Sequence, residues 1–86
     1  MRYRDYHQRN LIEAALNAYD GIPLQSRTHT VPFVTDNLMR YEEYQMFLDP
    51  VNRLVEMGEL DFEVGSSLDD IVKILRKLQL SSHQVK

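Results

Sequence analysis

The clearest pattern of hydrophobic and polar positions lies between Leu60 and Lys77. Up to Gly65, hydrophobic and charged residues alternate, which is the pattern of a strand with one buried face. After Gly65 the hydrophobic residues recur at three- and four-residue steps, at Leu68, Ile71, Val72, Leu75 and Leu78. This spacing predicts an amphipathic helix over residues 68–80. The segment therefore predicts a strand, a turn and a helix, whose hydrophobic faces must be covered by the rest of the chain.

The predicted helix over residues 68–80 has charged residues suited to both of its ends. Ser67 and Asp70 have the spacing of a capping box, in which each side chain bonds the backbone N–H of the other residue. Two aspartates lie near the positive end of the helix dipole, and basic residues follow toward its negative end. These features place the start of the helix at Ser67.

The first half of the chain predicts one long helix and one short strand. Hydrophobic spacing indicates a helix over residues 3–20, and the irregular residues 21–30 are expected to form a connecting loop. Alternation over Thr28–Val34 predicts a strand; because Pro32 lacks an N–H, this strand must lie at a sheet edge or have that position facing outward. Because a lone strand cannot satisfy its backbone, we expect Thr28–Val34 to pair with Leu60–Val64.

The middle of the chain predicts a second helix that begins near Asp36, with Thr35 or Asp36 as the N-cap. Asp49-Pro50 combines an N-cap residue with a proline at the first helical position. It therefore predicts a new short helix spanning Pro50–Met57, with Gly58 as its C-cap, in preference to a bend in one continuous helix.

Together these elements predict one small globular domain over residues 1–86, with residues 1–5 and 81–86 expected to fray. The predicted fold class is mainly α with a minor β part: three longer helices, one short helix and a small two-stranded ribbon. The chain has no cysteine, which excludes disulfides and cysteine-bound zinc. It has neither a hydrophobic run of membrane-spanning length nor a recognisable secretory signal, so we expect a cytoplasmic setting.

The residues that usually carry catalysis do not form a pattern in this sequence. His7, His29 and His83 lie in different segments, and no phosphate-binding glycine loop is present. Asp61 and Glu63 share a predicted strand face, for which solvation is favoured over acid–base chemistry. We expect no enzyme, no cofactor and no metal site; a hydrolase-like or metal-dependent activity is a minor alternative.

The helix predicted after Asp36 is the strongest candidate for a binding surface. It is hydrophobic around much of its circumference, so either other helices enclose it or one side meets a partner. Residues 36–64 carry eight acidic residues and two arginines, a net charge of −6, between mildly basic ends. These charges could merely coat the surface, or they could mark a basic partner or antiparallel self-association. We predict a non-enzymatic interaction or regulatory module, a homodimer in the first instance, with its interface at Met39, Tyr41, Glu43, Tyr44, Met46 and Phe47.

A second hypothesis is DNA binding. Residues 48–65 resemble the end of a winged-helix domain, with hydrophobic or glycine residues of the expected kind at Val51, Leu54, Val55, Gly58, Leu60 and Phe62. The resemblance implies a small DNA-binding transcriptional regulator. Two departures are an acidic recognition helix and a helix in place of the second wing strand. The nucleic-acid contacts would then come from the basic N-terminal stretch, at Arg2, Arg4 and Arg9, or from the C-terminal helix. The alternative for the N-terminal stretch is a helix start with tyrosines folded onto the core.

Overall fold

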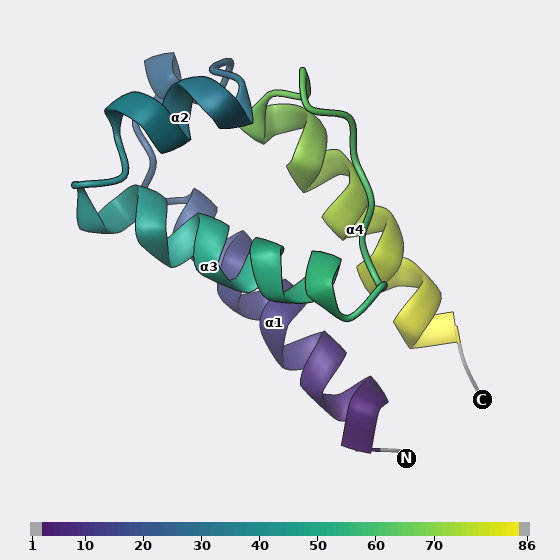
Figure 1. Ribbon diagram of the computed structural model, residues 1–86. Helices are drawn as coiled ribbons and strands as arrows, with labels where there is room; N and C mark the ends of the chain where they lie inside the picture. Colours follow the sequence, from purple (N-terminus) through teal and green to yellow (C-terminus); the bar gives the residue numbers. More distant parts are fainter. Residues whose placement is uncertain (1–2, 85–86) are drawn as a thin grey trace.

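The computed structural model describes residues 3–84, and the side chains of residues 6–81. Figure 1 shows the elements within this range, and α1 lies behind α3 in that view. The four α-helices of the described residues, with one 3₁₀ turn after the first, are α1 (Tyr3–Tyr19), η1 (Leu24–Ser26), α2 (Val31–Asn37), α3 (Glu42–Glu56) and α4 (Leu68–Gln84). The predicted mainly helical fold is confirmed. None of the described helices combines the length and the hydrophobicity needed to cross a membrane.

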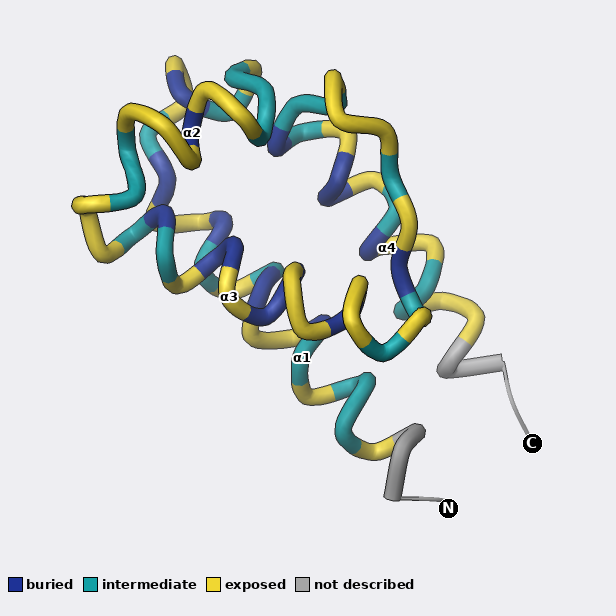
Figure 2. The backbone as a smooth tube through the Cα atoms, in the orientation of Figure 1, coloured by how far each residue is buried: buried dark blue, intermediate teal, exposed yellow. Residues whose placement is uncertain are grey.

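One hydrophobic core joins all four α-helices and is shown as the buried positions in Figure 2. The largest share comes from α3, and α4 contributes the stripe predicted from its spacing, with Leu68, Ile71, Val72 and Leu75 fully buried and Leu78 packed against them. The remaining core residues are Ile12, Ala15, Tyr19, Ile22, Val34, Tyr44, Phe47, Leu48, Val51, Leu54 and Leu60.

The strand predicted for Thr28–Val34 is wrong, because most of this segment forms helix α2. Pro32 lies in the first turn of α2, where its missing N–H costs nothing. The Val34 N–H donates to the Thr30 carbonyl at 3.1 Å, as in a helix. The predicted helix start near Asp36 is wrong for the same reason, since α2 ends at Asn37 and α3 begins only at Glu42.

The predicted partner strand Leu60–Val64 forms no β-ladder, and the described residues contain no strand, so the two-stranded ribbon is also wrong. The segment is held by its side chains, with Leu60 buried and Phe62 packed against the core. The one β-type contact recorded in the described range is an isolated bridge between Thr30 and Ser67. Its two hydrogen bonds join the start of α2 to the start of α4: the Val31 N–H donates to the Ser66 carbonyl at 3.2 Å, and the Leu68 N–H donates to the His29 carbonyl at 3.1 Å.

Helix α3 continues through Pro50, so the separate helix predicted over Pro50–Met57 is wrong. Pro50 cannot donate a hydrogen bond to the carbonyl four residues earlier, but its ring is buried. Core residues precede and follow it on the same face, including Phe47 and Leu54, and their burial favours one continuous helix. Gly58 ends this helix with φ of 75°, in the left-handed conformation expected of a C-cap.

The start of α4 matches its prediction. The Ser67 N–H donates to Asp70 Oδ2 at 3.2 Å, and the Asp70 N–H donates to Ser67 Oγ at 3.1 Å. These reciprocal bonds form the predicted capping box. The helix extends to Gln84, beyond the predicted end, and the backbone of residues 81–84 is helical.

Candidate interaction surface

The candidate surface is built on α3, whose two sides differ sharply in burial. Tyr44 is 4% exposed and Phe47 is 0% exposed, so these two residues of the predicted interface belong to the core. The Tyr44 hydroxyl donates to the Ser26 Oγ at 2.7 Å, and the Phe47 ring lies 5.8 Å from the Tyr19 ring. Tyr44 and Phe47 therefore fix α3 to the bundle.

The other four residues of the predicted interface reach the surface. Tyr41 is 42% exposed and Met46 is 56% exposed, whereas Met39 and Glu43 are half-buried. The helical period explains the division, since Met46 lies about 100° from Phe47 around the axis and points away from the core. The accessible patch is thus Met39, Tyr41, Glu43 and Met46, and we call it the corner patch.

The side chain of Tyr41, in the corner between α2 and α3, is held in place by its neighbours. The Arg40 guanidinium lies 4.9 Å from the centre of the Tyr41 ring and donates to the Tyr41 hydroxyl at 2.9 Å. On its other side, Tyr41 makes an edge contact with the buried Tyr44 ring, at 6.4 Å between ring centres. The exposed ring is therefore positioned from both sides, which lowers the entropy lost when it meets a partner.

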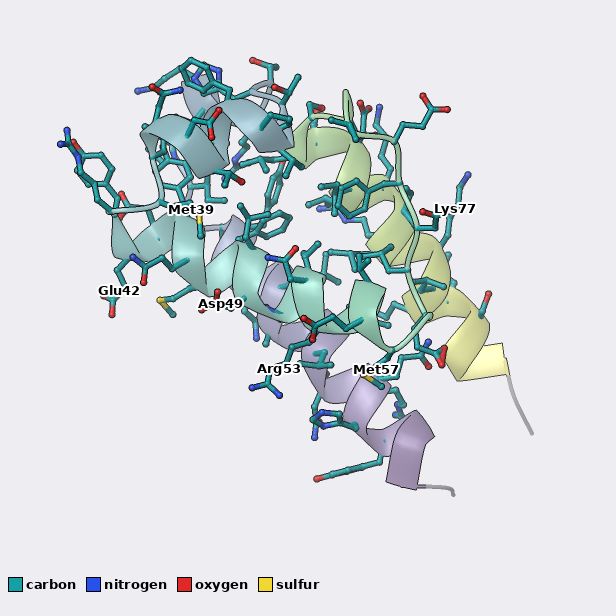
Figure 3. All side chains as sticks on the ribbon, viewed as in Figure 1. Met39, Glu42, Asp49, Arg53, Met57 and Lys77 are labelled. Carbon is teal, nitrogen blue, oxygen red and sulfur yellow. The ribbon has the colours of Figure 1, made fainter. Side chains whose placement is uncertain are left out.

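The outer side of α3 continues the surface beyond the corner patch. Figure 3 shows Glu42, Asp49 and Arg53 projecting from the same side of the helix, and all three are exposed. With exposed Glu56 at the end of the helix, this outer face carries three acidic residues and one basic residue. It is an acidic surface with one exposed methionine in its first half.

A separate polar cluster fastens α1 to the start of α4. The Tyr19 hydroxyl donates to Asp69 Oδ1, and the Arg27 guanidinium lies 4.3 Å from the centre of the Tyr19 ring. Arg27 also donates to the carbonyls of Tyr19 and Ile22, at 3.2 and 3.1 Å. Burial raises the pKa of the Tyr19 hydroxyl above its ordinary value, and the hydrogen bond to Asp69 raises it further. Each polar group here has a partner, which is the behaviour of a structural cluster.

The residues predicted for nucleic-acid contact are only partly described. Arg2 lies outside the described residues. Arg4 lies in α1, but its side chain is not described, and Arg9 is half-buried. The wing implied by the winged-helix resemblance is missing from residues 60–64, because this described segment pairs with no strand. What remains of the resemblance is a helix that ends at a glycine.

The described part of the chain contains no cluster of metal-ligating side chains. No group of three or more His, Asp or Glu residues there could hold a metal ion. His29 packs against Phe33 with ring centres 4.3 Å apart, and Asp61 and Glu63 are exposed.

None of the predicted contact residues lies on the outer face of α4, which is a second charged surface. Lys73, Arg76 and Lys77 are all exposed there, beside an exposed Leu80. At the sequence level, the helix dipole alone accounted for basic residues near the end of this helix. Their spacing of three and four residues was the signal that they share one face.

Comparison with protein-family models, with curated proteins and with solved structures found no match for this chain.

Proposed function

We propose that this chain is a non-enzymatic protein-interaction module that associates with further copies of itself through the corner patch and the outer face of α3. One observation supports this proposal above the others: α3 is fixed to the core by Tyr44 and Phe47, while Tyr41 and Met46 on the same helix are substantially exposed. A rigid helix that presents a tyrosine and a methionine has the composition that is enriched at protein interfaces.

The acidic residues around these side chains suit a rim. Glu42 is exposed and Glu43 is half-buried beside Tyr41, so a contact centred on Tyr41 and Met46 would leave both carboxylates near its edge. Charges at a rim guide the approach and the choice of partner more than they add affinity. The acidic rim therefore favours a partner surface that carries basic residues.

The test is the mass of the protein by light scattering at micromolar concentration and above. Replacing Tyr41 with Ser and Met46 with Lys should shift the mass toward that of the monomer, because both side chains are exposed and the core is untouched. Tyr44 is unsuitable for this experiment, since its loss would remove core packing and the bond to Ser26. Circular dichroism should show unchanged helix content.

The matched control replaces two hydrophobic residues elsewhere that are even more exposed, Leu24 with Ser and Val64 with Lys. This control variant should associate like the wild type. Self-association is the wrong function if the wild type is monomeric at high concentration. The corner patch is the wrong surface if the Tyr41 and Met46 variant associates with unchanged affinity.

A further inference from the structure

We propose that the outer face of α3 on one copy contacts the basic outer face of α4 on the neighbouring copy, so that copies associate head to tail. This inference rests on the proposed self-association and names the partner surface for it. Among the described residues of α4, the exposed charges are Asp70 near the start and Lys73, Arg76 and Lys77 farther along. The outer face of α3 has three acidic residues and one basic residue, so the two faces carry net charges of opposite sign.

The charges on α4 are available for such a contact. Asp70, its one exposed acid in the described range, already accepts the Ser67 N–H in the capping box. Within the described part of the chain, the basic side chains Lys73, Arg76 and Lys77 have no hydrogen-bond or ion-pair partner. A second copy can therefore engage them without breaking a bond inside the first.

Each face also carries an exposed hydrophobic residue among its charges. Met46 lies on the outer side of α3 and is 56% exposed, and Leu80 lies beside the basic residues of α4 and is 61% exposed. A contact between the two faces would remove both side chains from water.

The positions of the two faces decide the form of the assembly. Figure 3 shows Lys77 on the outer side of α4, while Glu42 and Asp49 project from α3 away from α4. One copy thus offers the two halves of the contact in different directions. A contact between unlike surfaces leaves one half unused at each end, so it continues beyond a dimer or closes into a ring.

The decisive experiment uses two charge-reversal variants. One replaces Asp49 and Glu56 with Lys, and the other replaces Lys73 and Lys77 with Glu; all four residues are exposed. Each variant alone should associate at least about tenfold more weakly than the wild type, because like charges then face each other. Mixed in equal amounts, the two variants should associate again. The intact α3 face of one meets the intact α4 face of the other, and the two reversed faces are again opposite in charge.

The mass measured by light scattering should therefore be higher for the mixture than for either variant alone, with the two variants alternating in the assembly. The control variant replaces Lys73 and Lys77 with Arg, which keeps the charge and should associate like the wild type. Raising the salt concentration should weaken the wild-type contact.

The outcomes separate this inference from the proposed function. If the α4 reversal leaves association unchanged while the Tyr41 and Met46 variant weakens it, self-association stands and the α4 surface is wrong. If both reversals are monomeric and their mixture also stays monomeric, head-to-tail pairing is wrong. A wild type that is monomeric at all concentrations overturns both.

Discussion

The start of α4 and the middle of α3 carry similar local signals for a helix start, but a helix begins only at the first of these two positions. Ser67 precedes a hydrophobic stripe and closes a capping box with Asp70. Asp49 precedes Pro50, a combination equally favourable at the first turn of a helix, yet α3 passes through it without ending.

The difference lies in what surrounds each signal. Before Ser67 the chain forms a turn at residues 64–65, and the polar groups of Ser66 bond outside the helix, so the cap has N–H groups to satisfy. Before Asp49 the chain is already helical, and buried residues on both sides of Pro50 hold one axis, notably Phe47 and Val51. Local capping is worth about 1 kcal/mol, whereas burying one large hydrophobic side chain contributes about 1.5–3 kcal/mol. The core therefore outweighs the local signal.

The largest expected effect tests whether the stripe of α4 is as central as that of α3. Leu75→Asp should unfold the domain or leave it without fixed packing, because an unpaired carboxylate would enter a fully buried position at a cost of several kcal/mol. Thermal unfolding followed by circular dichroism measures it. The control, Arg76→Asp, puts the same group on the exposed face and should cost less than about 1 kcal/mol. A Leu75→Asp variant with the wild-type melting temperature would contradict the burial of Leu75 in the core.

The next effect tests the cost of the proline inside α3. Pro50→Ala should stabilise the protein by about 1–2 kcal/mol, since a gain of about 3 kcal/mol in helix propensity exceeds the loss of two buried methylene groups at about 0.8 kcal/mol each. Urea unfolding provides the free energy. Asp49→Ala, at the exposed neighbouring position, should change it by no more than about 0.5 kcal/mol. Destabilisation by Pro50→Ala would mean that packing of the ring dominates.

A smaller effect tests the capping box. Ser67→Ala should cost about 1 kcal/mol, because the Asp70 N–H loses its acceptor. The neighbouring Ser66→Ala is the control and should be nearly neutral, since Ser66 uses its backbone N–H and carbonyl. A change within error for Ser67→Ala in the same urea experiment would remove the energetic contrast between the two signals.

The smallest effect concerns the bond that adds a tertiary contact to the start of α4. Because the pKa of Tyr19 is raised in the folded state, its contribution is fully present below about pH 10, the unfolded value, and is lost as the pH rises through the folded value. The free energy of unfolding should thus fall at alkaline pH. Tyr19→Phe should cost about 0.5–1 kcal/mol near neutral pH and show a smaller alkaline fall. Tyr6→Phe, at an exposed position, should keep the full alkaline fall; equal profiles for the Tyr19→Phe variant and the wild type would contradict this role.

The candidate surface was predictable only in part. The composition of residues 38–47 indicated this helix as the candidate, because its hydrophobic residues exceed one stripe. Which of them face outward depends on the helical phase relative to α1 and the rest of the core, and that phase places Tyr44 inside and Met46 outside. The predicted boundaries, with one helix starting near Asp36 and another at Pro50, did not describe the single helix that begins at Glu42 and continues through Pro50.

The sequence by itself determined the elements whose signals are complete within one segment: the long first helix, the glycine that ends α3, and α4 with its cap and buried stripe. Each depends on bonds or periodicity spanning a few neighbouring residues. The tertiary structure decided the state of Thr28–Val34 and the continuity of α3. A short alternating segment containing proline can be an edge strand or the first turn of a helix, and its local energies differ little. No described segment pairs with Thr28–Val34 in a β-ladder, and Val34 is buried in the core; together these favoured helix.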